Sequence, residues 1–496
     1  MEERYIASID LGTSKFGLCV ARVKGNDVQI VYYKETPSAG IRGSVVANPM
    51  KASIPLKAAI REAEDELMIK ILQVVVGMPR NDVRQETANG GIVRSNPDEY
   101  ITEEEVENLK AMALESYPLD DTDSQIMYGA VAQSFSIDDQ IQLVESDVVG
   151  TLSSSLEGNF KVFIGSRRAT TAVDKIFNSM GIAIAKKYFL PDVVARTVLG
   201  EEDRQNGVAL VDIGAGVTSV AIYHGGIMRY YAAIPFGGKS ITGDIRTECS
   251  ISEDLAEKIK LKFGACMPGK LASLSEKVLQ IRLTEPYKEV SVKYISEVID
   301  ARCREIIDAV LYYIQESGLQ NNLRSGIVLT GGGANLVNLG NLFKEISGYE
   351  VRTGFPRHLF SASVGSGLYN PSATSAIGMV LAAKDDRLPD CITRPEPVWK
   401  DPEPVVEETP AEEEGFFVPD PVFDEQGQGT MFSAEETEAP VTEDEPAEMP
   451  EQKPKKVKTK EKKPKAPRKS GMFWHKFGQN VRTGFLDLYD EITKDE

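Results

Sequence analysis

The most constraining feature of the sequence is a short unit that occurs twice, far apart in the chain. IASIDLGTSKFGLCVARV (residues 6–23) and GVALVDIGAGVTSVAIYHGG (residues 207–226) each run from an apolar strand through an aspartate and a glycine turn into a second strand. A Walker loop or a dinucleotide fingerprint would instead lead into a helix. One such unit alone would be read as an ordinary β-hairpin. Two units favour a duplicated fold that closes on one ligand from both sides.

Both turns combine residue types that suit phosphate and magnesium. Glycines let backbone N–H groups approach phosphate oxygens closely, and neighbouring hydroxyls can donate further hydrogen bonds. An aspartate at a strand end can hold hydrated Mg²⁺, which keeps several waters and takes one or two carboxylates. We therefore predict Asp10 and Asp212 as Mg²⁺ ligands through water. The other predicted phosphate-site residues are Gly12, Thr13, Ser14 and Lys15 in the first turn and Gly214, Gly216 and Thr218 in the second.

A third glycine turn follows later in the chain. GIVLTGGGANLVNL (residues 326–339) reads as a buried strand, a run of glycines and a helix. Alone this is a common strand-to-helix turn, but after the first two turns it predicts a place where backbone packs against a purine and its sugar. The predicted adenosine contacts are Gly331, Gly332, Gly333 and Asn335.

The C-terminal segment has a different pattern. SGMFWHKFGQNVRTGFLDLYDEIT (residues 470–493) carries an apolar stripe at helical spacing, and the basic run KPKKVKTKEKKPKAPRKS precedes it. An aromatic-rich face, flanking cations and a long tether predict an amphipathic helix at 471–493 that lies in a membrane interface. A terminal helix docked on the protein's own core is the alternative. The predicted membrane-facing residues are Phe473, Trp474, Phe477, Val481, Phe485 and Leu488.

The net charge of −19 is unevenly divided along the chain. Residues 396–451 hold 19 acidic residues and one lysine, whereas residues 452–496 hold 13 basic and six acidic residues. The acidic, Pro-rich stretch at 395–452 is predicted to be a disordered linker. Only the basic end is attracted to anionic lipid. Nucleic acid is the weaker option as a partner, because duplex binding has no use for the aromatic stripe.

Cysteine and histidine usage excludes several kinds of chemistry. The five cysteines are scattered without a CxxC pair, and only three histidines are present. This argues against a zinc site and a histidine-based triad, and it favours reduced thiols in the cytoplasm. We find no signal-peptide pattern and no apolar run near the ~20 residues that span a bilayer. The expected location is the cytoplasmic face of the membrane, as a peripheral protein.

Taken in order, these segments resemble the nucleotide motifs of the actin/DnaK/sugar-kinase ATPase superfamily. The three turns would be its phosphate-1, phosphate-2 and adenosine motifs. LPDVVARTVLG (residues 190–200) and ATSAIGMVLAA (residues 373–383) would be its two connecting helices, with Ala376 and Gly378 permitting a close helix crossing. Within the superfamily the chain resembles the FtsA family of actin-like bacterial division proteins, from about Tyr5 to Ala383 and again at the terminal helix.

One further pair gains its meaning only from this resemblance. Glu257 and Lys260, one turn apart in DLAEKIK, match the pair that binds the ribose hydroxyls in DnaK-like relatives. From the residues alone, a solvated i,i+3 salt bridge would be the better interpretation.

The resemblance implies an α/β fold with two actin-like, ribonuclease H-like domains around a nucleotide cleft, each with a five-stranded sheet. A subdomain is inserted in the first domain, and a disordered tail ends in the amphipathic helix. The expected divisions are IA at 1–80 and 182–206, the insert IC at 81–181, IIA at 207–240 and 311–394, IIB at 241–310, the acidic linker at 395–452, the polybasic segment at 453–470 and the terminal helix at 471–493.

The resemblance also implies a function. Relatives bind ATP with Mg²⁺, polymerise at the membrane, anchor the ring of the tubulin-like FtsZ at the division septum, and recruit later division proteins through IC. Subdomain IIB would bind the C-terminal peptide of FtsZ, with Lys293 and Arg302 at the contact. Glu201 and Glu202 are candidates for positioning water in a hydrolysis that is slow at most, although the sequence offers no obvious base.

Two other functions within the superfamily remain as alternatives. A metabolite kinase would explain the glycine turns but would not need a basic amphipathic terminus. A DnaK-like chaperone would carry a β-rich peptide-binding domain after the ATPase, and residues 396–451 cannot form one.

Overall fold

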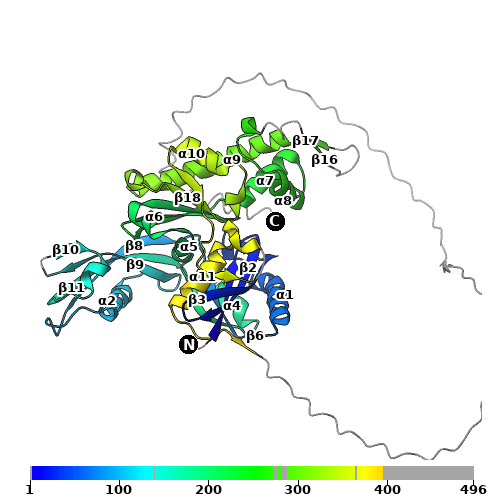
Figure 1. Ribbon diagram of the computed structural model, residues 1–496. Coiled ribbons are helices and arrows are strands. Elements are labelled where there is room, and N and C mark those ends of the chain that lie inside the picture. Colours follow the sequence, from blue (N-terminus) through cyan, green and yellow to red (C-terminus); the bar gives the residue numbers. More distant parts are fainter. Residues whose placement is uncertain (1–2, 139, 272–276, 282–287, 364–365, 395–496) are drawn as a thin grey trace, which may run out of the picture. The chain divides into compact units, whose positions relative to one another are not determined.

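The computed structural model describes residues 3–394 except 139, 272–276, 282–287 and 364–365 (Figure 1). The predicted linker, polybasic segment and terminal helix therefore lie outside the described residues, together with Phe473, Trp474, Phe477, Val481, Phe485 and Leu488. Among the described helices, none has the length and apolarity needed to cross a bilayer.

The first sheet contains six strands in the order β12-β7-β1-β2-β3-β20. Its members are β1 (Glu3–Leu11), β2 (Lys15–Lys24), β3 (Asp27–Pro37), β7 (Gln73–Gly77), β12 (Ala183–Tyr188) and β20 (Ser361–Ala362). The first three strands form an antiparallel meander, and β7 and β12 continue the sheet in parallel with β1. The prediction of five strands is wrong by one. The additional β20 pairs only two residues with β3, which is too short to give a periodic signal.

Helices cover both faces of this sheet. Alternate residues of β1 point to opposite sides, so Ala7 and Ile9 pack with α1 (Pro49–Leu67) and α4 (Arg167–Asn178). On the other side, Ile6 packs with α5 (Leu190–Val198) and α11 (Thr374–Asp385). The sequence places α4 within the insert, but its apolar face is buried on the first sheet.

The two connecting helices cross closely, as the sequence predicts. A Cβ added at Gly378 of α11 would lie 2.5 Å from the carbonyl oxygen of Val193 in α5. The Ser8 hydroxyl of β1 donates to the carbonyl of Ala376 at 2.8 Å, which fixes α11 against the sheet. A larger side chain at Gly378 would force the two helices apart.

Between β7 and β12 the chain builds a separate sheet in the order β10-β9-β11-β8 (Figure 1). We call it the inserted sheet. It consists of β8 (Arg84–Val93), β9 (Gln125–Ile137), β10 (Gln140–Leu143) and β11 (Ser155–Ser166), with α2 (Glu103–Ser116) packed on it and α3 (Glu145–Val148) beside β9. The Thr102 hydroxyl accepts the Glu105 N–H while the Glu105 carboxylate accepts the Thr102 N–H. The sequence ITEEEVENLKAMALESYP (residues 101–118) predicts a helix with an acidic cap, and this capping box confirms it.

The second large sheet has the five strands expected, in the order β15-β14-β13-β18-β19. These strands are β13 (Val208–Ile213), β14 (Thr218–His224), β15 (Ile227–Ile234), β18 (Ile327–Thr330) and β19 (Val351–Thr353). One face packs against α7 (Gly238–Cys249), α8 (Glu253–Phe263), α9 (Val292–Glu316) and α10 (Leu339–Ser347). The opposite face packs against α5 and against Tyr128 and Phe163 of the inserted sheet.

Short elements complete the described chain. They are the pairs β4 (Ile41–Arg42) with β5 (Val45–Val46), β6 (Lys70–Ile71) with β21 (Ile392–Thr393), and β16 (Val278–Ile281) with β17 (Lys288–Ser291); the helix α6 (Glu201–Asn206); and 3-10 turns at Pro268–Lys270, Gln320–Asn322, Gly332–Asn335, Ser366–Tyr369 and Pro371–Ala373. Through β20, α11 and β21 the end of the body packs on the first sheet, whereas the sequence groups all of 311–394 with the second domain.

Candidate functional site

The two predicted phosphate turns touch each other in the structure. The first turn joins β1 to β2, and the second joins β13 to β14. A Cβ added at Gly216 would lie 2.8 Å from Thr13 Oγ1 and 3.1 Å from the Cα of Gly43. Glycine at this position therefore allows the turns of two different sheets to meet. We call residues 10–15 and 212–218, together with the Arg80 side chain that lies between them, the paired-turn site.

The side chain between the turns belongs to Arg80. Its guanidinium pairs with the Asp212 carboxylate, and it lies 3.9 Å from the Asp10 carboxylate. The same group donates to Ser375 Oγ at 2.7 Å. Arg80 is only 12% exposed, and the side chains of Asp10 and Asp212 are 19% and 8% exposed. The structure thus brings both predicted metal ligands to one buried cation.

The charges of this cluster depend on one another. Burial raises the pKa of the Asp10 carboxyl; the Arg80 guanidinium opposes this rise, and the neighbouring Asp212 carboxylate adds to it. Burial also disfavours the charged guanidinium, but Asp212 and Asp10 outweigh that effect and raise the pKa of Arg80. Two buried carboxylates that share one cation form a donor set suited to a hydrated divalent ion. The residues present therefore fit Mg²⁺, with the guanidinium as the stand-in cation.

The third turn packs directly against Asp212. Gly331 has φ +81°, in the left-handed region, and an added Cβ would overlap the Asp212 carboxylate and the carbonyl of Ile213. The Asn335 amide, one turn further on, donates to Asn370 Oδ1 at 2.9 Å and to the Gly332 carbonyl at 3.2 Å. Gly333 lies against Ile213 in the same way. The predicted adenosine turn and the second phosphate turn are thus neighbours.

The Glu257–Lys260 pair is connected to the same region. Lys260 Nζ lies 2.7 Å from the Glu257 carboxylate and donates to the Gly238 carbonyl at 2.9 Å. The Gly238 N–H in turn donates to the Gly214 carbonyl of the second turn at 2.9 Å. The Lys260 side chain is 10% exposed, so the pair is not the solvated salt bridge that the residues alone favour.

The hydroxyl groups of the two turns differ in what they contact. Thr13 Oγ1 accepts the Ser44 N–H at 2.9 Å beside Gly216, and Ser14 is exposed. Thr218 is fully buried and donates its hydroxyl proton to the Phe236 carbonyl at 2.9 Å. This contact corrects the expectation that Thr218 donates to a phosphate. Lys15 forms an ion pair with Glu35, whose carboxylate also accepts from Ser372 Oγ.

The remaining predicted residues lie elsewhere. Glu201 and Glu202 are exposed at the start of α6. This helix packs on β14 and accepts a hydrogen bond from the Gly225 N–H in the following hairpin. It therefore lies at the opposite end of β14 from the second turn. Lys293 is exposed near the start of α9. Arg302, further along α9, pairs with both Asp244 oxygens at 2.6 and 2.9 Å and with Glu305 at 2.6 Å.

Sequence reasoning missed Arg80. It follows the strand segment ILQVVVGMP, where the sequence places the boundary to the insert, and a single arginine after a proline carries no spacing signal. Its position at the end of a strand beside β1 could have identified it, because the ends of parallel neighbours meet at one sheet edge.

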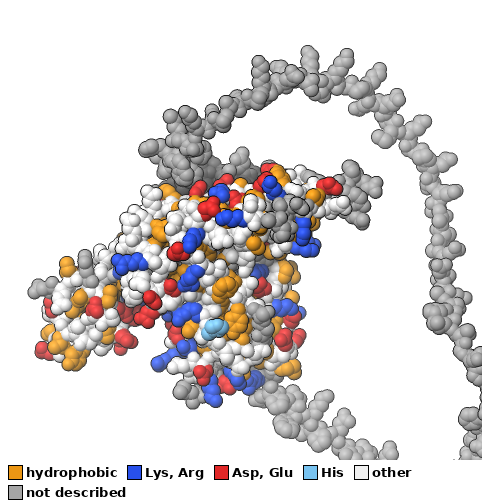
Figure 2. Space-filling view, turned by 45° about the horizontal axis from the view of Figure 1, so that its top comes forward, with side chains coloured by type: hydrophobic (Ala, Val, Ile, Leu, Met, Phe, Trp, Pro, Cys, Tyr) orange, Lys and Arg blue, Asp and Glu red, His pale blue; other side chains and the backbone are white. Residues whose placement is uncertain are grey.

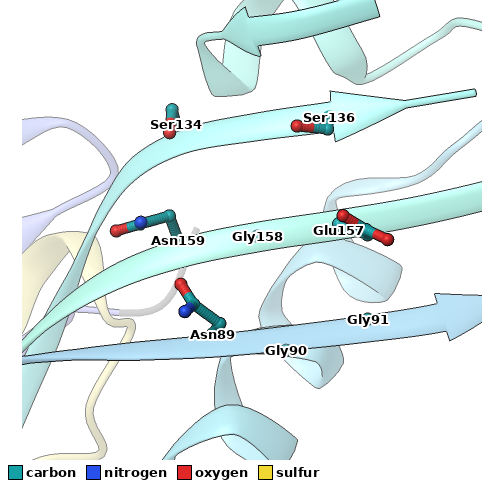
Figure 3. Close-up of a pocket in the computed structure, with 8 residues that line it drawn as sticks. All are labelled: Asn89, Gly90, Gly91, Ser134, Ser136, Glu157, Gly158 and Asn159. Carbon is teal, nitrogen blue, oxygen red and sulfur yellow. The ribbon is translucent and has the colours of Figure 1, made fainter. Parts of the chain in front are cut away.

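A hollow of about 470 Å³ lies away from this site, on the inserted sheet (Figure 3). Figure 3 shows Asn89, Asn159 and Ser134 grouped at one part of it and Ser136 and Glu157 at another, across β8, β11 and β9. Its lining consists of glycine, serine and asparagine residues and one glutamate. It contains none of the predicted nucleotide residues.

Comparisons with known proteins show which family the chain resembles. A family model described as cell division protein FtsA matches residues 209–378. Cell division protein FtsA of Borreliella burgdorferi is 30% identical over 384 residues, covering 77% of this chain and 91% of that relative. FtsA of Neisseria meningitidis is 29% identical over 392 residues, with coverage of 77% and 91%.

Solved structures support the fold. The PilM–PilN type IV pilus biogenesis complex matches with a TM-score of 0.55 and 16% identity, covering 76% of this chain and 98% of that chain. The predicted α/β fold with two actin-like domains is confirmed. With the identity to the Borreliella relative extending over nearly its whole length, the chain belongs to the FtsA family of actin-like cell division proteins.

Proposed function

We propose that the paired-turn site binds ATP with Mg²⁺. The observation that carries this proposal is the meeting of Asp10 and Asp212, from two different sheets, at one buried cation between two glycine turns. Asp10 and Asp212 would hold the hydrated ion, and the backbone of residues 12–14 and 214–216 would face the phosphates. Gly331–Gly333 would lie along the adenosine, and Glu257 and Lys260 along the ribose. The bound ion would supply charge neutralisation to the phosphates.

Calorimetric titration with ATP at saturating Mg²⁺ tests this assignment. Asp212→Ala should weaken ATP binding strongly, because it removes a metal ligand and leaves Arg80 without its closest partner. Asp254→Ala is the matched control, since Asp254 is an exposed carboxylate on α8 outside the paired-turn site. Equal ATP affinity in the wild type and Asp212→Ala would contradict the proposal.

We further propose that the chain polymerises at the membrane through its actin-like body and anchors there by its terminal helix. Figure 2 shows basic and acidic side chains interspersed on the face it draws, so this face offers no uniform basic surface to anionic lipid. The basic tail supplies that attraction instead. With the dimensions of a random coil, a tether of residues 395–470 would span roughly 50 Å, which leaves room between the bilayer and the body for a filament.

Anchoring should depend on assembly. Burying Trp474, Phe477 and Phe485 would contribute about 1.5–3 kcal/mol each at most, less the entropy lost in ordering the helix. One copy would therefore bind weakly, and a polymer would bind durably because each further anchor acts at high local concentration.

Sedimentation with anionic liposomes tests the anchor. The full chain should pellet with the vesicles, and a truncation after Arg394 should stay in the supernatant. Trp474→Glu combined with Phe477→Glu should behave like the truncation. Undiminished pelleting of this double variant would remove the terminal helix as the anchor.

We also propose that this chain links the FtsZ ring to the inner face of the cytoplasmic membrane at the septum. Residues 241–310, as subdomain IIB, would bind the C-terminal peptide of FtsZ. The inserted sheet, within the expected subdomain IC, would contact later division proteins. Lys293 supports the first contact as an exposed cation on α9, whereas Arg302 would have to exchange Asp244 and Glu305 for a peptide carboxylate.

Fluorescence anisotropy with a labelled FtsZ C-terminal peptide tests this contact. Lys293→Glu and Arg302→Glu should each weaken peptide binding while ATP affinity stays unchanged. Arg324→Glu provides a charge-matched control in the loop before β18. If neither α9 variant loses affinity for the peptide, the peptide binds elsewhere.

A further inference from the structure

Arg80 is a buried cation with partners from three parts of the fold. Its guanidinium faces Asp10 at the end of β1, Asp212 at the end of β13 and Ser375 at the start of α11. Within the part of the chain that the structure describes, no other cation forms an ion pair with either aspartate. The nearby Lys15 is instead paired with Glu35.

The backbone of Arg80 is also held by hydrogen bonds. Its N–H donates to Ser44 Oγ at 3.3 Å, and its carbonyl accepts the Tyr231 hydroxyl of β15 at 2.9 Å. Arg80 lies in the connection between β7 and the inserted sheet. A fixed backbone with one long side chain allows the guanidinium to change partners while the residue stays in place.

The charges indicate what such a change would do. The two aspartates and Arg80 carry one net negative charge. A divalent ion that approaches without nucleotide must therefore compete with Arg80 for the Asp212 carboxylate. A guanidinium that leaves Asp212 retains its charge and its planar set of donors. Phosphate oxygens, like carboxylate oxygens, can accept a bidentate pair of hydrogen bonds from such a group.

We propose that Arg80 is an exchangeable counter-cation of the paired-turn site. Without nucleotide it occupies Asp212; when Mg²⁺ and nucleotide enter together, Asp10 and Asp212 take the hydrated ion, and the guanidinium turns to the phosphate oxygens. Arg80 is thus a phosphate-contacting residue that also makes metal binding depend on nucleotide. This inference rests on the proposed ATP site.

Arg80→Gln tests the exchange, because it should change the affinities for Mg²⁺ and for ATP in opposite directions. Titration of MgCl₂ alone should show roughly tenfold tighter binding than in the wild type, since two carboxylates are left without a cation. Titration of ATP at saturating Mg²⁺ should show binding about tenfold weaker or more, since a charge-assisted contact to phosphate is lost. A general folding defect would weaken both.

Two further variants complete the test. Arg84→Gln removes the same charge four residues away, from a largely exposed pair with Asp120, and should leave both affinities unchanged. Arg80→Lys keeps the charge but lacks the planar fork, so it should shift both affinities in the same directions as Arg80→Gln by a smaller factor. It also decides the question if Arg80→Gln does not fold.

The outcomes are distinct. Unchanged MgCl₂ affinity, or a loss of both affinities, in a folded Arg80 variant would overturn the exchange. Failure of the wild type to bind ATP at all would contradict the proposed function and the phosphate contact with it. In that case the MgCl₂ titration would still decide whether Arg80 occupies the metal position.

Discussion

The turn at 10–15 and the turn at 212–218 are built from the same residue types, yet their surroundings differ. Asp10 lies 3.9 Å from Arg80, whereas Asp212 pairs with Arg80 directly. A Cβ added at Gly17 would lie 3.8 Å from Asp10, an ordinary van der Waals contact, whereas a Cβ added at Gly331 would overlap the Asp212 carboxylate. Thr13 faces the other turn, whereas Thr218 is sealed in the second domain. One local pattern therefore yields two roles, and tertiary packing decides between them.

Replacing the two aspartates should reveal this asymmetry most strongly. Asp212→Ala leaves the Arg80 charge buried without its closest partner, which should destabilise the fold by about 3–5 kcal/mol. Asp10→Ala leaves the Arg80–Asp212 pair intact and should change stability by about 1 kcal/mol or less. Urea unfolding measures both variants, and equal losses would contradict the assignment of Asp212 as the main partner.

The glycines that face the two aspartates should differ next. Gly331→Ala forces a side chain into left-handed backbone and into the Asp212 carboxylate, at an expected loss of about 1–3 kcal/mol or more. Gly17→Ala is the matched control, since its Cβ would meet Asp10 and Ala376 at 3.8 and 3.7 Å. Its midpoint of thermal unfolding should stay close to that of the wild type. A similar drop in both variants would mean that the two aspartates are equally confined.

The two threonines should separate stability from binding. Thr218→Val removes a buried donor to the Phe236 carbonyl and should lower stability by about 1 kcal/mol without changing ATP affinity. Thr13→Val leaves the Ser44 N–H without its acceptor and should lower both. Urea unfolding and ATP titration of each variant provide the comparison. A loss of ATP affinity in Thr218→Val would mean that the Thr218 hydroxyl contacts the phosphates after all.

The smallest expected effect on stability concerns Glu35, the carboxylate that pairs with Lys15 of the first turn. Burial raises the pKa of its carboxyl, but contacts with Lys15, Ser372 and Tyr33 outweigh burial and hold the pKa below its usual 4.5. The folded state therefore favours the ionised form, so this stabilisation is complete above pH 4.5 and is lost as the pH falls through the lowered pKa. The side chain is 30% exposed, so the expected gain is about 0.5 kcal/mol or less.

Glu35→Gln provides the test. The variant should unfold at a lower urea concentration than the wild type at pH 7, and the two midpoints should converge as the pH falls below 4.5. A difference that grows on acidification would give the opposite sign and contradict the lowered pKa.

Local patterns predicted those parts of the molecule that local physics determines. The short apolar runs in residues 6–23 and 207–226 predicted the strands around each turn, and the acidic start of ITEEEVENLK predicted a capped helix. The small residues Ala376 and Gly378 predicted the close crossing of α5 and α11. Each of these signals lies within a few residues of the feature it specifies.

The features that were missed depend on long-range packing. Arg80 reaches Asp212 across 132 positions of sequence, and nothing beside it in the chain marks that partner. The pairing of β20 with β3 involves two residues, and the burial of Thr218 depends on the carbonyl of Phe236 in a neighbouring segment. Such contacts have no period, so the pattern that identified the two turns could not show how they differ.

The most direct test of the paired-turn site is a crystal structure with a non-hydrolysable ATP analogue and Mg²⁺. We expect the phosphates between residues 12–14 and 214–216, the ion beside Asp10 and Asp212, and the adenosine along Gly331–Gly333, with the Arg80 guanidinium moved from Asp212 to the phosphates. Nucleotide bound at another surface, with the Arg80–Asp212 pair unchanged, would contradict both the site and the exchange.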